Sequence, residues 1–317
     1  MEKITIFGTG NYAKKNWKKV REKYDIVAAL DNKVNESETL EFEDGLKIYR
    51  PCQYMELKNY PILILVYNYK DIVKQLVSLG VEAKNIWISN LDANSNEIEY
   101  VTSEEINRVI ASPNKVISED WGYRRGTPIG RFYINKFLTT YHHIIVGDIM
   151  EVGDSSYSMK YSVKSKVKSY TAIHVEGAEG CRKANLETGE GLYSEEFDTM
   201  IITQTLAYIY DLKSVVENVY KSLKKGGHCL ITVTDIGHMG KNEMEKYGTY
   251  WGFHKGGCKK LFADVFGEEN VIVETYGNIK TVVAQLYGLA AEDLEKECFD
   301  EHDELYPQII GIVVHKV

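Results

Sequence analysis

Two apolar segments that each end in small or polar residues constrain the fold of this chain more than any other feature. Residues 148–154 read DIMEVGD and residues 197–206 read FDTMIITQTL. An apolar run with such an ending is typical of a buried parallel strand that presents ligand-contacting groups at its carboxyl end. We therefore expect both segments in one nucleotide-binding type of sheet, with a ligand crevice above Gly153 and Gln204.

The chain has 317 residues, which is too long for one typical core, so two domains are expected. The alternation of short apolar runs and helical patterns predicts an α/β fold class with two Rossmann-like domains. We place a small nucleotide-binding-like domain at 1–95, a linker rich in Asn, Asp, Glu and Ser at 96–120, and the larger domain at 121–317.

The elements expected in these domains follow from apolar runs, helical spacing and glycine stops. In the first domain we predict strands at 3–7, 25–30 and 62–66, a helix that the turn at 8–13 opens and that runs to about 23, and a helix from 70 to 79. In the second domain a helix is predicted at 212–223, ended by the KKGG of 224–227. Its predicted strands are 149–152, 167–175, 199–203, 229–233, 271–274 and 309–315.

Charge and cysteine usage exclude several classes of partner. The net charge of −8 and the pI near 5.6 argue against a nucleic-acid partner, which needs a cationic face. The five cysteines lack the paired spacing of a zinc or redox motif, so we expect reduced thiols and no metal. The chain starts without a signal-peptide pattern, and its longest apolar run is too short to span a bilayer. A cytoplasmic protein with a small-molecule or glycan substrate is expected.

A glycine-rich turn follows the first predicted strand. Gly8 and Gly10, in GTGNYA, are suited to letting backbone N–H groups approach a phosphate at a helix N-terminus. Asp31 stands where an acidic residue would hold ribose hydroxyls. The same residues also suit a turn kept for chain geometry alone, and both interpretations stay open. One mononucleotide-sized unit is too short for a full dinucleotide, which disfavours hydride transfer with NAD.

Residues 6–10 (IFGTG), 28–31 (AALD), and 62–66 (ILILV) with the helical pattern at 70–80 resemble the small N-terminal domains of bacterial sugar-modifying enzymes such as sugar acyltransferases. This generic resemblance implies a nucleotide-linked sugar as the ligand of the first domain.

The second domain carries a sharper resemblance, over about two hundred residues and in the family's order. The matching segments are RGTPI with RFYI and FL (125–138), EVGD (151–154), TQTL with IYD (203–211), LKKGG (223–227), YW (250–251) and ETYGN (274–278). They resemble a class I S-adenosylmethionine-dependent methyltransferase of the bacterial surface-glycan type. The resemblance implies a cofactor site at Arg131, Tyr133, Glu151, Gly153, Asp154, Thr171, Gln204 and Thr205.

The resemblance also implies roles for these residues. Gly153 and Asp154 would let the backbone approach the methionine part of S-adenosylmethionine, and Gln204 with Thr205 would line the path of the methyl group. Arg131 and Tyr133, on the helix before the first strand, would close over the carboxylate end of the cofactor.

The chain departs from the family at two positions that usually carry carboxylates. Counting along the second strand places the ribose-binding position at Thr171, and a second acidic position falls on Asn185. Loss of the ribose-binding carboxylate would cost about 1.5–3 kcal/mol of cofactor binding. Glu176, at the end of the same strand, is a substitute carboxylate.

Methyl transfer to a hydroxyl benefits from a general base, and histidine suits that role at neutral pH. His238 and His254 lie in loops that follow the strand ending at Val233, and they are the candidate bases. Either histidine also suits an ordinary surface position. Tyr250 and Trp251 fit an apolar wall against a sugar ring, or simple packing under the loop.

Two main functions remain after these observations, beside a third interpretation in which the degenerate site of the second domain accepts a different nucleotide altogether. The first is a methyltransferase that uses S-adenosylmethionine to modify a sugar or a nucleotide-linked sugar in glycan biosynthesis. The second is a non-catalytic nucleotide-sugar-binding or scaffold protein with a degenerate methyltransferase fold, which would account directly for Thr171 and Asn185.

Overall fold

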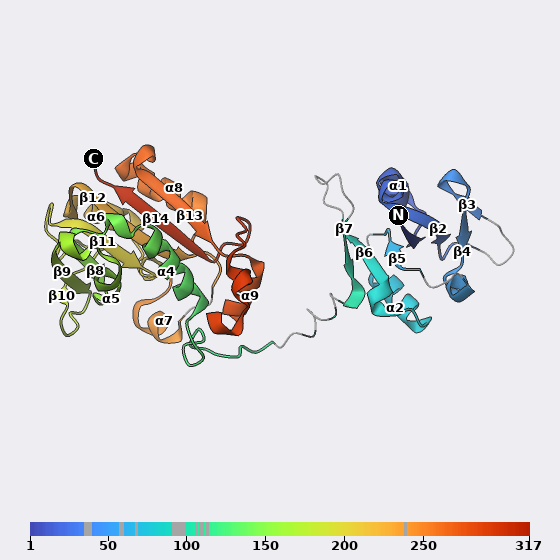
Figure 1. The fold of residues 1–317 in the computed structure, drawn as a ribbon, viewed down its shortest axis with the longest axis horizontal. Coiled ribbons are helices and arrows are strands. Elements are labelled where there is room, and N and C mark those ends of the chain that lie inside the picture. Colours follow the sequence, from blue (N-terminus) through green and yellow to red (C-terminus); the bar gives the residue numbers. More distant parts are fainter. Residues whose placement is uncertain are drawn as a thin grey trace. The chain divides into compact units, whose positions relative to one another are not determined.

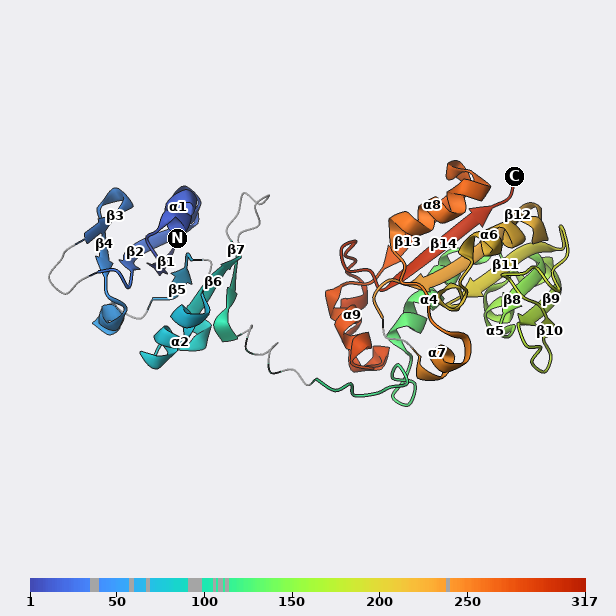
Figure 2. The same ribbon diagram turned by 180° about the vertical axis from the view of Figure 1, so that it is seen from behind.

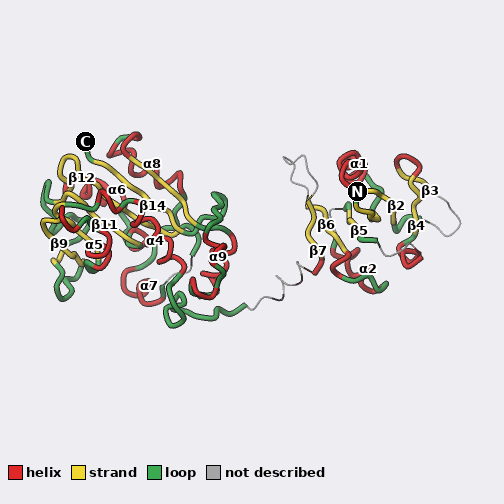
Figure 3. Tube along the Cα trace, in the orientation of Figure 1, coloured by secondary structure: helices red, strands yellow, loops and turns green. Residues whose placement is uncertain are grey.

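The structure is a computed structural model that describes residues 1–34, 40–56, 60–66, 69–90, 99–104, 107, 111, 114–237 and 240–317. It divides into two compact units, Met1–Asn114 and Lys115–Val317. Each unit contains a central sheet with helices packed around it (Figure 3). The predicted α/β class is thereby confirmed, with a largely parallel sheet in each of two units.

The first unit has the strand order β3-β4-β2-β1-β5-β6-β7. Its five inner strands are parallel, and β3 and β7 run antiparallel at the edges. β7 pairs with β6, so part of the segment predicted as a linker at 96–120 belongs to the first sheet. The elements are β1 (Glu2–Phe7), α1 (Asn11–Lys23), β2 (Tyr24–Leu30), β3 (Leu40–Phe42), β4 (Leu46–Tyr49), β5 (Ile62–Ile64), α2 (Lys70–Ser78), β6 (Ile86–Asn90) and β7 (Glu99–Thr102).

The second unit has the strand order β10-β9-β8-β11-β12-β14-β13, in which β14 runs antiparallel to both of its neighbours. Its elements can be followed in Figure 1. They are α4 (Ile129–Thr140), β8 (Gly147–Val152), α5 (Ser156–Tyr161), β9 (Val167–His174), β10 (Arg182–Lys183), β11 (Phe197–Thr203), α6 (Leu212–Ser222), β12 (Leu223–Thr234), α7 (Lys241–Tyr247), α8 (Lys255–Phe266), β13 (Val271–Tyr276), α9 (Ile279–Leu286) and β14 (Ile309–His315).

The first five strands of this second sheet follow the order 3-2-1-4-5 of a doubly wound fold. The order reverses between β8 and β11, which are paired in parallel with Ile201 opposite Glu151. The two segments that opened the sequence analysis are therefore neighbours in one sheet, as predicted. The predicted helix stop at 224–227 lies inside β12 instead, because α6 already ends at Ser222.

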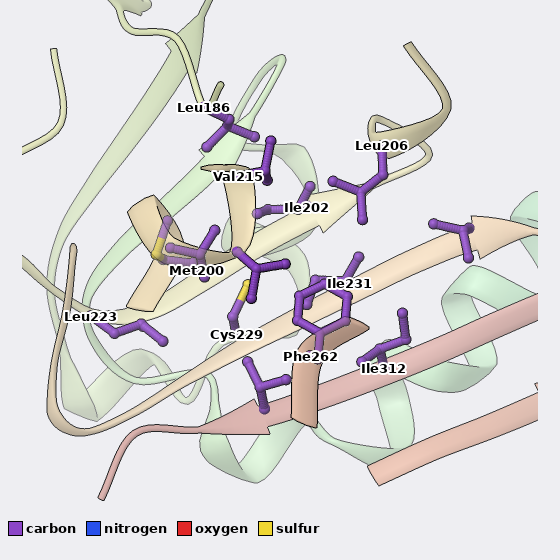
Figure 4. Packing of buried hydrophobic residues seen from close by; sticks show 14 of the residues in the cluster. Leu186, Met200, Ile202, Leu206, Val215, Leu223, Cys229, Ile231, Phe262 and Ile312 are labelled. Atoms are coloured by element: carbon purple, nitrogen blue, oxygen red, sulfur yellow. The ribbon is translucent and has the colours of Figure 1, made fainter. Parts of the chain in front are cut away.

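Helices cover both faces of the second sheet, which Figures 1 and 2 show from opposite sides. On one face, α6 and α8 pack on β11, β12 and β14 (Figure 4). Fully buried residues there include Val215 of α6, Phe262 of α8 and Ile312 of β14. On the other face, α4 and α9 bury Phe137 and Ala284 against the same strands. Both faces are apolar, so the ligand-contacting edge is left at the strand ends.

Candidate functional site

The switch point between β8 and β11 is where open α/β sheets bind ligands, just beyond the carboxyl ends of the strands. Gly153 follows β8 at this edge with φ +99°, and its N–H donates to the Ile173 carbonyl at 2.9 Å. A Cβ added to Gly153 would meet no atom within 4 Å. The backbone at Gly153 therefore faces open space that a ligand can approach closely.

A cavity of about 710 Å³ lies at the same edge, within the usual range for small-molecule sites. The ends of β11 and β12, the start of α4 and the loop before α8 all contribute to it. Among the lining residues are Trp121, Tyr123, Arg131, Tyr157, Gln204, Tyr208, Asp235, Glu243, Thr249, Tyr250, Trp251, Gly252 and Gln285. The Thr249 hydroxyl is buried and has no hydrogen-bond partner among the described residues, which leaves it available to a ligand.

Gln204 holds an unusual backbone conformation at the end of β11. Its φ is +51°, a left-handed value that few residues other than glycine adopt. Its N–H donates to the Thr232 carbonyl at 2.8 Å, and its Oε1 accepts from the Thr234 hydroxyl at 2.6 Å. Strain of this kind persists where the surroundings hold the residue in place, often at functional sites. Thr205 instead donates its hydroxyl to the Thr203 carbonyl at 3.0 Å and lies outside the cavity lining.

Glu151 accepts hydrogen bonds from the first turn of α5. The residue is only 2% exposed, and its carboxylate accepts the backbone N–H groups of Tyr157 at 3.1 Å and Ser158 at 2.7 Å. Burial raises the pKa of this carboxyl, although the hydrogen bonds from Ser158 oppose the rise. Asp154 accepts the N–H of Ser156, the residue just before Tyr157, at 2.7 Å. Both carboxylates therefore shape the turn after Gly153.

Arg131 and Tyr133 point in different directions from α4. The Arg131 guanidinium lies over two rings of the cavity wall, 5.2 Å from the Tyr123 centroid and 5.8 Å from the Tyr157 centroid. Tyr133 is 1% exposed, packs against Phe299 and points its hydroxyl at Thr281. The structure thus brings Arg131 to the cavity and keeps Tyr133 in the hydrophobic core.

The structure places Thr171 inside β9 rather than at its end. Thr171 is in register with Met150, whereas the Gly153 N–H reaches the carbonyl of Ile173. The carboxylate nearest the end of β9 is that of Glu176, which is exposed and paired with Lys246. This hydrogen bond lowers the pKa of Glu176. Glu176 therefore stands at the carboxyl edge where Thr171 was expected.

Asn185 lies just after β10 and stabilises its own turn. Its Oδ1 accepts the N–H groups of Glu187 at 2.8 Å and Thr188 at 3.2 Å. These bonds give the side chain a local structural role.

His254 immediately precedes α8 and forms a pair with an acidic residue that the sequence analysis did not single out. Its Nδ1 lies 3.0 Å from Asp235 Oδ1 and 3.1 Å from Oδ2. The Asp235 side chain is 5% exposed and lines the cavity, whereas the His254 side chain is 83% exposed. A carboxylate on Nδ1 orients the ring and leaves Nε2 as the proton acceptor. His238, the other candidate base, lies outside the described residues.

In the first unit the glycine-rich turn and Asp31 are brought together. Asp31 Oδ2 accepts the Thr9 N–H at 2.9 Å and the Thr9 hydroxyl at 2.6 Å. Gly8 has φ +101°, and an added Cβ would lie 2.6 Å from a methyl carbon of Val66. Gly10 precedes α1, with open space around it. The carboxylate thus ties the turn to the end of β2, and the nucleotide-binding role of Gly8, Gly10 and Asp31 stays a prediction.

Within the described residues, no group of His, Cys, Asp and Glu side chains has the arrangement of a metal site. The same residues include no helix long and apolar enough to cross a bilayer.

The family model described as C2185-like, N-terminal, matches residues 1–87 of the chain. The search of curated proteins found no match to the chain.

Several solved structures are similar to the chain. A SAM-dependent methyltransferase from Archaeoglobus fulgidus is 12% identical, with 59% of this chain and 94% of that chain covered and a TM-score of 0.39. The N-methyltransferase NodS from Bradyrhizobium japonicum, in complex with S-adenosyl-L-homocysteine, is 12% identical over 67% of this chain and 97% of that chain, with a TM-score of 0.39. Phosphoethanolamine N-methyltransferase 2 from Haemonchus contortus, in complex with S-adenosyl-L-methionine, is 9% identical over 99% and 94%, with a TM-score of 0.39.

Proposed function

We propose that this chain is an S-adenosylmethionine-dependent methyltransferase that modifies a hydroxyl or amine of a glycan sugar or a nucleotide-linked sugar. The observation that carries the proposal is a convergence at one edge of the second sheet. The open turn at Gly153 follows β8 and the Glu176 carboxylate follows β9 at this edge. The 710 Å³ cavity lies at the ends of β11 and β12 on the same edge, and Gly153 and Glu176 are not among its lining residues. Its motifs also follow the order of the class I family that the sequence resembles.

The residues at this edge fit the cofactor in three parts. Gly153 leaves room for the backbone to approach the methionine portion. Arg131 offers a cation to the methionine carboxylate at the cavity wall. Glu176, whose low pKa keeps it anionic at neutral pH, can accept hydrogen bonds from the ribose hydroxyls. The unpaired hydroxyl of Thr249 adds a polar contact inside the cavity.

When bound, S-adenosylmethionine would supply a methyl group attached to a positively charged sulfur. The methyl group would pass from this sulfur to the acceptor atom. The task of the protein is then to take the acceptor's proton. His254 Nε2 is the candidate base, because Asp235 holds Nδ1 and orients the ring. Gln204, fixed by Thr232 and Thr234, faces the same cavity and orients the acceptor.

Calorimetric titration of the full chain with S-adenosylhomocysteine tests this function, beside the variants Gly153→Leu and Gly226→Leu. The two glycines are matched, because both have positive φ and an added Cβ at either would meet no atom within 4 Å. They differ in place, since Gly226 lies near the start of β12 and donates its N–H to Lys316. Both variants therefore place a leucine at a positive φ, which strains the backbone, and only Gly153→Leu does so at the proposed site.

We expect binding by the wild-type chain and by Gly226→Leu, and loss of binding in a folded Gly153→Leu. Equal loss in both variants would assign the effect to backbone strain and contradict the proposed crevice. A folded wild-type chain that does not bind the ligand would refute the function. That result would favour the alternative of a nucleotide-sugar-binding protein with a degenerate fold.

A further inference from the structure

A second cavity, of about 440 Å³, adjoins the first. The two cavities share Trp251 and Gly252. The other residues that line the second cavity are Tyr210, Asp211, Leu212, Lys213, Phe253, His254, Gly257, Cys258 and Leu261. Its volume is in the lower part of the range for small-molecule sites, so it suits a ligand of modest size.

The wall between the two cavities is held in place by the segment after β11. The Tyr250 N–H donates to the Ala207 carbonyl at 2.8 Å. The indole N–H of Trp251 donates to the carbonyls of Ile209 at 3.0 Å and Tyr210 at 3.2 Å. These bonds fix the orientation of the indole ring before any ligand arrives, which reduces the entropy that binding must overcome.

Three exposed aromatic rings gather on this wall. Tyr210 is 67% exposed, and Tyr250 and Trp251 are each more than two-fifths exposed. The Tyr210 and Trp251 rings stack with centroids 5.9 Å apart, and the Tyr250 ring meets Tyr210 edge-on at 5.5 Å. A fixed cluster of exposed aromatic rings at a cavity is typical of a binding surface. Its flat apolar faces with polar edges suit a sugar ring, which has an apolar face and hydroxyls around its rim.

The charges of both cavities disfavour a nucleotide diphosphate. In the second cavity, Lys213 lies near Asp211 in the chain and pairs with Glu217 at 4.0 Å. In the first cavity the described lining has a cation at Arg131, against the carboxylates of Asp235 and Glu243. A diphosphate is normally bound by clustered cations or by several backbone N–H groups. The lining is better matched to an uncharged ligand.

We propose that the second cavity binds one sugar unit of a neutral glycan chain while the neighbouring unit occupies the first cavity, where it is methylated. The placement of the methylated unit rests on the proposed function. His254 lines the second cavity and its partner Asp235 lines the first, so the pair stands at the junction of the two sugar units. Tyr210 and Trp251 contact the second unit. The acceptor is therefore a glycan of two or more units and not a nucleotide-linked monosaccharide.

The test uses the full chain with bound S-adenosylhomocysteine on a printed array of bacterial surface oligosaccharides, their constituent monosaccharides and nucleotide-linked sugars. The variants are Trp251→Ala, Trp251→Phe and Tyr210→Ala. Tyr193→Ala serves as control, because Tyr193 is 64% exposed and lines neither cavity. Saturation-transfer NMR then measures the affinity for the best oligosaccharide. Calorimetry with S-adenosylhomocysteine checks the first site separately, and Tyr210→Ala is the decisive variant because Tyr210 lines the second cavity alone, whereas Trp251 lines both.

We expect oligosaccharides to bind better than their monosaccharides and the nucleotide-linked sugars. Trp251→Ala and Tyr210→Ala should each weaken oligosaccharide binding by about tenfold or more, as for buried aromatic anchors in other interfaces. Trp251→Phe should keep most of the affinity, and Tyr193→Ala all of it. Preferred binding of nucleotide-linked sugars, oligosaccharide binding that Tyr210→Ala leaves intact, or no glycan binding by a chain that binds S-adenosylhomocysteine would each overturn the proposal. If the wild-type chain does not bind S-adenosylhomocysteine, that result would instead count against the methyltransferase function.

Discussion

Replacement of Glu151 by Ala is the sharpest test of how the protein builds the turn beside its proposed cofactor site. α5 starts after Ser155, which makes no side-chain hydrogen bond to the first turn of the helix. Glu151, reaching from β8, accepts the N–H groups of Tyr157 and Ser158 instead. The substitution leaves both N–H groups without this acceptor, in a part of the unit where Glu151 and Ser158 are buried.

Each unsatisfied buried N–H costs about 1–3 kcal/mol, so the two together cost roughly 2–6 kcal/mol. Removing a buried charge offsets part of this cost, because burial already raises the pKa of Glu151. We therefore expect Glu151→Ala to lower the free energy of unfolding by roughly 2–3 kcal/mol. In a unit of this size, that corresponds to a fall of about 4–12 °C in the unfolding midpoint.

The dependence on pH reports how burial acts on the Glu151 carboxyl. Since the folded-state pKa of Glu151 is raised above its ordinary value of 4.5, the folded state holds the proton more tightly. The contribution of this group to stability is fully present below pH 4.5 and falls as the pH rises through the folded-state pKa. The gap between the wild-type chain and Glu151→Ala should therefore narrow as the pH rises above 4.5.

Urea unfolding at several pH values, followed by circular dichroism, measures this gap. Glu179→Ala is the control, because Glu179 is an exposed carboxylate of the same unit. Unchanged stability in Glu151→Ala would refute the assignment of Glu151 as the acceptor for α5. A gap that widens with rising pH would instead refute the burial-raised pKa, because it would mean that the hydrogen bonds to the carboxylate outweigh its burial. S-adenosylhomocysteine affinity should fall in the same variant, since α5 begins three residues after Gly153.

Three further outcomes are expected. Asp31→Ala should lower the stability of the first unit by about 1–3 kcal/mol, because the Thr9 N–H and hydroxyl lose their acceptor; amide exchange in β1 and β2 that is as slow as in the wild type would contradict this. Burial and the nearby His315 lower the pKa of His228 to about 4, so stability should rise between pH 4 and 6.5, and His228→Gln should flatten that rise in urea titrations. The hydrogen bond from an arginine lowers the pKa of Asp293 to about 2, so the stability difference between wild type and Asp293→Asn should fade as the pH falls from about 4 to 2.

Strand patterns predicted the centre of each sheet better than its edges. The segments that form β8 and β11 each have an apolar, buried centre, and their pairing follows from that burial in the sheet. Short edge strands such as Leu40–Phe42 and Glu99–Thr102 carry charged residues, and they exist through pairing with a neighbour. That pairing has no counterpart in local sequence, so β3 and β7 were missed.

Helical spacing contained the information that separates Arg131 from Tyr133. Ile129, Tyr133 and Phe137 recur every four residues and form the buried stripe of α4, whereas Arg131 falls between them. The periodicity therefore indicates a core position for Tyr133. The level of Thr171 could not be predicted in the same way, because the depth of a residue along a strand depends on register with its neighbours.

The antiparallel strand β14 explains why Asp235 and His254 lie where they do. Because β14 runs opposite to β12, its first residues lie at the carboxyl edge of the parallel strands, beside the cavity. The Asp235 N–H donates to the Gln308 carbonyl just before β14, at 3.1 Å, and Ile309 lines the cavity itself. A parallel strand in this place would present its other end there and leave Asp235 without that anchor. The orientation of the candidate base thus depends on the reversed strand, and this long-range arrangement is invisible in the residues around His254.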